Sequence, residues 1–291
     1  MRADARRRKG GENLDDQSWV VDNLQNALTT WNDKLNEIWT LLTVSPQSFK
    51  GGGVWGIVTS INSALLPIAY GLLVLFFAMS VCKTCGSLTE IKRPEHALRL
   101  FIRFALAKAA VTYCMELLTS LFTIAQGIVA QIIGTAGLTG PNGGSLPQEL
   151  IDTINACGFW ESIPLWAVTL LGSLFITVMS FIMILTVYGR FFRMFMYTAI
   201  APVPLSAFAG ETTSHSAKAF VRSYLGVCLE GAIIALACTI YSSIAVTPAV
   251  SAGATPITAT WGYVSEVVFG QLVLVGTIKA SDHIVKDMLG L

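Results

Sequence analysis

Runs of apolar residues long enough to cross a lipid bilayer fill the sequence from Val54 onward. A transmembrane helix needs about 20 consecutive apolar residues, because the hydrocarbon core of a bilayer is about 30 Å thick. Five segments reach this length, at about residues 55–81, 100–134, 164–189, 219–245 and 261–280. The sequence therefore predicts an all-α polytopic membrane protein with about five transmembrane helices.

The composition excludes the soluble classes of protein. Hydrophobic residues make up 53% of the chain and charged residues only 13%, whereas a soluble domain carries about 25% charged residues. So few charges exclude a disordered chain, a collagen-like fibre, a coiled-coil rod and a soluble nucleic-acid binder. The net charge of +1 creates no overall field that would indicate a partner.

Loop charges predict the orientation of the spans. The loop after the first span is basic and the loop at 135–163 contains no Lys or Arg, so the positive-inside rule places the basic loops and the C-terminus in the cytoplasm and the N-terminus outside. Residues 191–209 are apolar but contain Pro202 and Pro204 and have basic residues at both ends. We expect a re-entrant or interfacial hairpin here. If the segment crosses instead, six spans place both termini on one side.

The residues before the first span divide into a basic polar tail (1–13) and an amphipathic helix with a glycine linker (14–53). Apolar residues spaced by four and three along this segment form one helical face. These residues are Leu24, Leu28, Trp31, Leu35, Ile38 and Leu42. Such a face suits either the lipid head groups or a surface on partner subunits.

Ionisable residues inside the spans are candidates for function, because a charge in the bilayer is costly. The four are Lys108, Glu116, Glu230 and Glu266. They could line a polar path for ions, protons or a translocated chain, or pair between helices, as in a Lys108–Glu230 pair. Small residues that allow close helix packing lie near Glu230 and Glu266, namely Gly226, Gly231, Ala235, Gly262 and Gly270.

A second group of candidates is the set of basic residues on the predicted cytoplasmic side. It consists of Lys92, Arg93, Arg99, Arg103, Arg190, Arg193, Lys218 and Arg222. These charges could set the topology and contact anionic lipids. They could also line the mouth of a channel for a polyanion or dock a cytoplasmic ATPase.

Enzyme chemistry is not expected. The sequence contains no GxxxxGK[ST], HExxH or GxSxG pattern. The pair Cys82 and Cys85 has no second CxxC and no neighbouring His, whereas a structural zinc site needs four ligands. We therefore predict no catalytic residue, no metal site and no cofactor.

Several segments together carry a family resemblance. They are LLTVSP at 41–46, WGIV at 55–58, INSALLPIA at 61–69, LFF at 75–77, RFFR at 190–193 and AIAP at 199–202. In this order and layout the chain resembles the TrbL-like polytopic inner-membrane subunits of conjugative type IV secretion systems, in the branch found on integrative elements of Gram-positive bacteria. The likeness covers most of residues 14–290.

The resemblance implies a non-enzymatic, homo-oligomeric channel or scaffold subunit for DNA transfer in the bacterial cytoplasmic membrane. Its implied partners are other copies of the chain, type IV secretion components including ATPases, phospholipids and transferred single-stranded DNA. The alternative from the residues is a small-ion or proton channel or secondary transporter that uses Lys108, Glu116 and Glu230.

Overall fold

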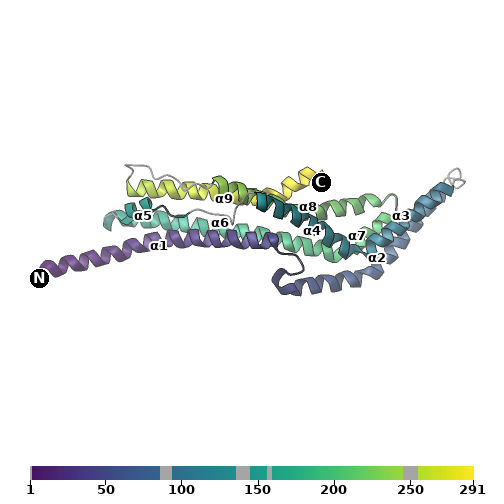
Figure 1. Ribbon diagram of the computed structural model, residues 1–291, viewed down its shortest axis with the longest axis horizontal. Coiled ribbons are helices and arrows are strands. Elements are labelled where there is room, and N and C mark those ends of the chain that lie inside the picture. Colours follow the sequence, from purple (N-terminus) through teal and green to yellow (C-terminus); the bar gives the residue numbers. More distant parts are fainter. Residues whose placement is uncertain (1, 86–93, 136–144, 156–158, 245–254) are drawn as a thin grey trace. The chain divides into compact units, whose positions relative to one another are not determined.

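A computed structural model describes residues 2–85, 94–135, 145–155, 159–244 and 255–291, and every element in this part of the chain is a helix (Figure 1). The prediction of an all-α fold is therefore confirmed. The elements in chain order are α1 (Arg2–Thr43), η1 (Phe49–Gly52), α2 (Gly53–Cys85), α3 (Pro94–Thr112), α4 (Cys114–Thr135), α5 (Gln148–Asn155), α6 (Phe159–Ile200), α7 (Pro202–Ser206), η2 (Ala207–Ala209), α8 (Ser214–Ile244) and α9 (Pro256–Leu289).

Five helical segments in the described residues are long and apolar enough to cross a membrane. They are Phe49–Lys83, Cys114–Thr135, Ile163–Ile200, Ser214–Ser243 and Pro256–Leu289. This number equals the number of spans predicted from the sequence, and it supports a multi-pass membrane protein. Two of these segments have other bounds than those estimated from the sequence.

The predicted second span at 100–134 is divided between α3 and α4 at Tyr113. The backbone hydrogen bonds continue across the division, from Tyr113 N to Ala109 O at 2.9 Å and from Leu117 N to Tyr113 O at 3.0 Å. Figure 1 shows the chain changing direction at this point. Only α4 is a candidate span, since Arg99, Arg103 and Lys108 make α3 more polar.

In the segment 191–209, for which we expect a re-entrant or interfacial hairpin, α6 continues to Ile200. Phe191, Met194 and Phe195 are buried, so packing extends the helix past the end expected at residue 189. The turn comes later, where Pro202 begins α7 and η2 ends at Ala209. At 1.5 Å per residue the 42 residues of α6 span about 63 Å, so the helix extends beyond the hydrocarbon core.

The helices divide into two compact units. The first consists of residues Met1–Leu41, Ile133–Val187 and Ile234–Ala280. In it α1 packs against α6 through stacked rings of Trp19 and Trp166, 5.9 Å apart, and against α8 through Trp31 and Tyr241, 6.2 Å apart. A methyl group at Gly172 of α6 would overlap Val264, so α6 and α9 also approach closely.

Helix α1 begins at Arg2, so the basic tail predicted at 1–13 is part of the helix. Its Arg, Ala and Lys residues favour helix formation. All six apolar residues of the amphipathic face, from Leu24 to Leu42, are buried. Through Trp31 this face contacts α8 of the same chain. From the sequence we expected it to contact lipid head groups or partner subunits.

The second unit consists of residues Leu42–Ile132, Tyr188–Ile233 and Ser281–Leu291. In it α2 and α3 lie side by side, and both contact α7 and η2 (Figure 1). The chain turns from η1 into α2 through left-handed backbone at Gly51 (φ 74°) and Gly52 (φ 80°), which glycine adopts without strain. Phe49 anchors this turn, because its ring stacks on Phe191 at 4.5 Å.

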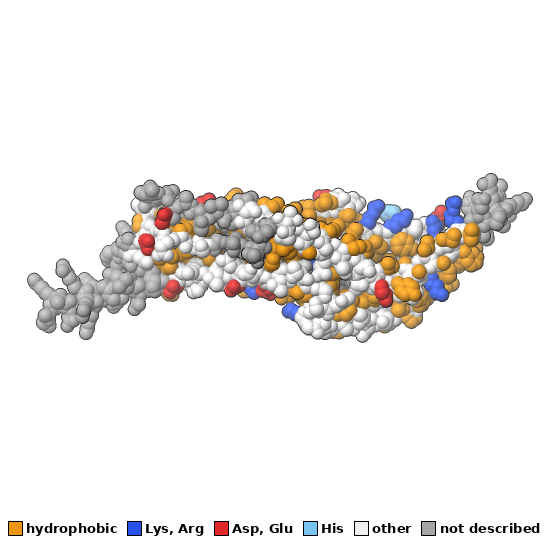
Figure 2. All heavy atoms as spheres, in the orientation of Figure 1, with side chains coloured by type: hydrophobic (Ala, Val, Ile, Leu, Met, Phe, Trp, Pro, Cys, Tyr) orange, Lys and Arg blue, Asp and Glu red, His pale blue; other side chains and the backbone are white. Residues whose placement is uncertain are grey.

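Hydrophobic side chains lie exposed on the face that Figure 2 shows, and large ones such as Ile57, Phe101 and Phe269 are more than half exposed. In the most apolar 18-residue stretch of the first candidate span, only 17% of the residues are buried inside the protein, and in that of α4 only 22% are buried. These helices therefore present most of their surface to lipid or to other proteins.

Candidate functional site

Glu230 of α8 is almost fully buried in the second unit, with 1% of its surface exposed. The guanidinium of Arg193 on α6 donates through Nη2 to both carboxylate oxygens, at 2.7 Å and 2.8 Å. Ser281 of α9 donates through Oγ to Oε1 at 3.3 Å. One carboxylate on α8 therefore joins α8 to α6 and α9. Its partners Arg193 and Ser281 lie 37 and 51 positions away in the sequence.

Arg193 extends this network to a second carboxylate. Its Nη1 lies 2.9 Å from Oδ1 of Asp282 on α9, and Oδ2 of Asp282 lies 2.8 Å from Nζ of Lys286 one turn later. The guanidinium thus holds one carboxylate on α8 and another on α9, and Arg suits this role because its donors are arranged in a rigid planar fork. We call Arg193, Glu230, Ser281, Asp282 and Lys286 the charge network.

Arg190 lies one turn before Arg193 and is 2% exposed. Its guanidinium carbon lies 5.2 Å from the centre of the Phe191 ring, and the positive charge is near enough to Glu230 to be attracted by it. Nε and Nη1 have no hydrogen-bond partner among the described residues. The absence of a side chain at Gly231 makes room for this guanidinium, because a methyl group there would overlap it.

Replacing Gly231 by leucine should therefore disrupt the packing of α8 against α6. Overpacking of a well-filled core costs about 1–3 kcal/mol, and we expect the upper end because Arg190 is too buried to move aside. Thermal unfolding of the purified protein in detergent measures the effect. The matched control is Gly262→Leu, since no atom lies within 4 Å of a Cβ there. Equal unfolding temperatures for the two variants would contradict the close packing at Gly231.

The other three ionisable residues predicted in the spans do not join the charge network. Lys108, Glu116 and Glu266 are exposed, and none forms an ion pair with a described residue. The Lys108–Glu230 pair considered from the sequence is not formed, because Arg193 occupies the position next to Glu230. Arg193 lies beyond the predicted end of the third span, so the sequence placed it among the cytoplasmic charges.

The predicted basic cluster separates into distinct places. Arg190 and Arg193 are at the buried site just described. Arg99, Arg103 and Lys218 line a groove formed by α3, η2 and α8, and Arg222 is exposed outside that groove. Lys92 and Arg93 lie outside the described residues.

The predicted small residues also differ in their surroundings. Gly226, Gly231 and Ala235 on α8 are buried, and a Cβ at Gly226 would lie 3.6 Å from Leu289 of α9. On α9, a Cβ at Gly270 would contact Tyr241 at 3.6 Å, whereas Gly262 is exposed. The α8 glycines therefore allow close helix packing, and Gly262 does not.

Two buried polar residues hold the second unit together without having been singled out in the sequence. Asn62 of α2 donates through Nδ2 to Thr198 O on α6 at 2.8 Å and accepts from Cys114 Sγ on α4 at 3.4 Å. The hydroxyl of Tyr224 on α8 donates to Leu118 O on α4 at 3.0 Å. Asn62 could have been noticed as a lone amide within a long apolar run.

No cluster of three or more His, Cys, Asp or Glu side chains with metal-binding geometry occurs in the described part of the chain. Cys82 is an exposed free thiol, and Cys114, Cys228 and Cys238 are buried free thiols. Buried thiols of this kind pack as small apolar side chains.

The chain matches a known protein family over a continuous stretch, which includes Arg193 of the charge network. A family model described as TrbL/VirB6 plasmid conjugal transfer like protein matches residues 31–202, more than half of the chain. The chain belongs to this family. The TrbL/VirB6 match begins within α1, covers η1 and α2 to α6, and ends at the first residue of α7. No curated protein and no solved structure matches the chain.

Family membership confirms the resemblance seen in the sequence. It makes this multi-pass membrane protein a component of conjugal transfer, the process carried out by type IV secretion machinery, and implies contact with other components of that machinery. Proteins of the TrbL/VirB6 family are structural subunits and are not known as enzymes.

Proposed function

We propose that the chain is a homo-oligomeric channel or scaffold subunit of a conjugative type IV secretion machine in the bacterial cytoplasmic membrane. The orientation proposed from loop charges places the C-terminus in the cytoplasm and the N-terminus outside. ATPases of the machine supply the energy for transfer, and transferred single-stranded DNA passes through or beside the assembled subunits.

The observation that carries this proposal is an unpaired carboxylate on the outside of a candidate span. Glu266 lies on α9, is exposed and forms no ion pair with a described residue. A charged side chain facing lipid costs about 2.5–3.5 kcal/mol near the bilayer centre. Contact with a neighbouring subunit or a water-filled lumen removes that cost. Glu116 on α4 is likewise exposed on a candidate span and forms no ion pair with a described residue.

The alternative of a small-ion or proton transporter has less support. It needs Lys108, Glu116 and Glu230 to share a polar path, but Glu230 is buried against Arg193 and Ser281 while Lys108 and Glu116 are exposed. Buried carboxylates paired in this way are typical of helix–helix contacts. Ion or proton flux across proteoliposome membranes would favour the transporter if the Glu230→Gln variant abolished it.

Replacing Glu266 by leucine tests the proposal. In a donor strain that lacks the chain, the wild type should restore DNA transfer, and Glu266→Leu should restore about tenfold less, since a polar contact between membrane helices is worth about 1–2 kcal/mol. Mating frequency is the measurement, at equal protein levels in the membrane. The matched control is Phe269→Leu, because Phe269 is an exposed apolar residue on the same helix.

Two outcomes would contradict the proposal. Undiminished DNA transfer by the strain that lacks the chain would show that the chain is not part of the conjugation machine. Full transfer by Glu266→Leu, together with a higher unfolding temperature, would show that this face of α9 meets lipid.

A further inference from the structure

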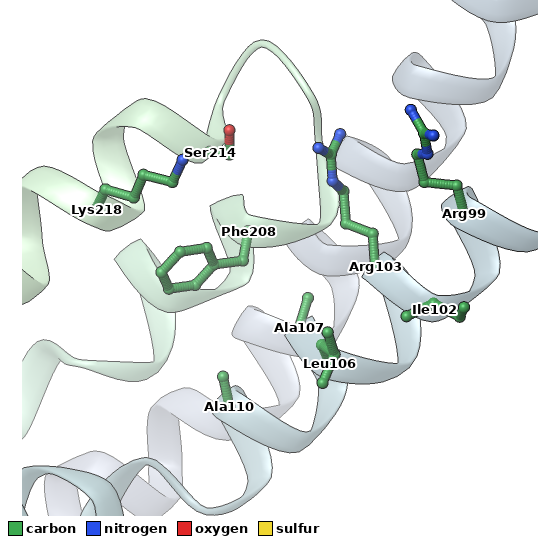
Figure 3. A pocket seen from close by; sticks show the side chains of 9 residues that line it. All are labelled: Arg99, Ile102, Arg103, Leu106, Ala107, Ala110, Phe208, Ser214 and Lys218. Carbon is green, nitrogen blue, oxygen red and sulfur yellow. The ribbon is translucent and has the colours of Figure 1, made fainter. Parts of the chain in front are cut away.

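A groove in the second unit combines positive charge with an apolar floor. It lies between α3, η2 and α8 and has a volume of about 470 Å³ (Figure 3). That volume is in the range of pockets that bind small molecules, about 300–1,000 Å³. All of the residues that line it belong to the second unit.

Three cations stand along the groove. Arg99 and Arg103 project from successive turns of α3, and Lys218 projects from α8 on the other side, as Figure 3 shows. None of the three forms an ion pair with a described residue. Like charges four residues apart on a helix destabilise it slightly, and a bound anion would reverse that effect.

Along the chain, Glu95 precedes Arg99 by four residues and Glu211 precedes Lys218 by seven. Glu211 forms no ion pair with a described residue. Glu211 precedes α8 and is exposed, and its backbone N–H donates to Ser80 Oγ at 3.1 Å. The Ser214 hydroxyl, which also lines the groove, donates to Glu211 O at 2.9 Å. Its lone pairs can still accept a hydrogen bond, so this side of the groove can meet both a phosphate and a hydroxylated head group.

The floor of the groove is apolar. Ile102 and Leu106 of α3 are 52% and 67% exposed, although they are large hydrophobic residues. Phe208 of η2 and the small residues Ala107 and Ala110 complete the floor, and Figure 3 shows the Phe208 ring between α8 and α3. An anion without an alkyl chain would leave this surface uncovered.

We propose that the groove binds one anionic phospholipid, with its phosphate between Arg99, Arg103 and Lys218 and an acyl chain along Ile102, Leu106 and Phe208. Basic pockets between helices on the cytoplasmic side of a membrane are suited to anionic head groups. A single-stranded nucleic acid fits less well, because such sites stack successive bases on several aromatic rings and Phe208 is the one aromatic residue among those that line the groove.

The bound lipid has a structural consequence. It cross-links α3 to the start of α8 through charges on both helices and covers apolar side chains that the protein itself leaves exposed. The lipid therefore holds α3 in place against α7 and η2, which α3 contacts, and so stabilises the bend where α3 ends and α4 begins.

Native mass spectrometry of the full chain, purified in an uncharged detergent and delipidated, tests the assignment. The probes are phosphatidylglycerol and phosphatidylcholine with the same acyl chains. Each lysine or arginine near an anionic surface is worth about 1 kcal/mol, so Arg103→Gln should weaken phosphatidylglycerol binding about fivefold and the triple Arg99→Gln, Arg103→Gln, Lys218→Gln variant about a hundredfold. The matched control is Arg222→Gln, an exposed cation of α8 outside the groove.

Two further arms separate the two parts of the site. Ala110→Phe should lower phosphatidylglycerol affinity with all three cations intact, because the ring fills the acyl slot. Soluble glycerol phosphate should compete only weakly, because it lacks an acyl chain. The assignment is overturned if phosphatidylcholine binds as well as phosphatidylglycerol, or if Arg222→Gln weakens binding as much as Arg103→Gln. It is also overturned if glycerol phosphate competes fully, or if a single-stranded oligonucleotide displaces the lipid at equal concentration.

Discussion

Replacing Glu230 by alanine is expected to lower the free energy of unfolding by about 3–5 kcal/mol. Removing one partner of a buried ion pair leaves the other charge without compensation, and this loss exceeds the net worth of the pair. Glu230 is 1% exposed and accepts hydrogen bonds from Arg193 and Ser281. The loss should appear as a lower unfolding temperature of the purified protein in detergent.

The control for Glu230→Ala is Glu211→Ala, since that carboxylate is exposed in the same unit and forms no ion pair with a described residue. A double-mutant cycle of Glu230→Gln with Arg193→Gln should give a coupling energy within about 0.5–3 kcal/mol. Arg193→Gln alone should cost less than Glu230→Ala, because the arginine side chain is 33% exposed and partly solvated. A coupling energy of zero would show that the two side chains do not interact in the protein.

Replacing Leu35 by aspartate is expected to have a comparable effect on the first unit. Leu35 is 0% exposed on the apolar face of α1. The change loses the burial of a leucine side chain and places a carboxylate in an apolar contact without a partner, at a combined cost of at least about 4 kcal/mol. We expect α1 to detach and become accessible to protease, which limited proteolysis followed by mass spectrometry would show.

Asn36→Asp provides the matched control for Leu35→Asp. It introduces the same side chain at the next position, where the residue is exposed, and exposed substitutions usually change stability by no more than about 0.5 kcal/mol. If the two variants resist protease equally, the amphipathic face of α1 does not pack against the chain's own helices.

The periodicity of apolar residues was sufficient to predict α1 and the number of candidate spans. Spacing by three and four encodes a helical face, and run length encodes the ability to cross a bilayer, so Leu24 to Leu42 and five spans could be identified. What that face contacts depends on residues such as Tyr241, which lies far along the chain and contacts Trp31. Local spacing carries no information about such contacts.

The charge network could not be predicted for the same reason. Glu230 was noticed because a carboxylate in an apolar run is costly, but its partner Arg193 lay beyond the expected end of the third span. Buried Phe191 and Phe195 carry α6 past that end and bring Arg193 to Glu230. Only tertiary packing decides that Arg193, and not Lys108, is the partner.

The mass and symmetry of the protein purified in nanodiscs test the proposed function most directly. Native mass spectrometry together with two-dimensional class averages would give the number of copies and their arrangement. A homo-oligomeric channel or scaffold subunit predicts a closed ring of several copies, with the Glu266 face of α9 at a subunit contact or at the lumen. A monomer, obtained even when the other membrane components of the conjugation machine are co-expressed, would contradict it.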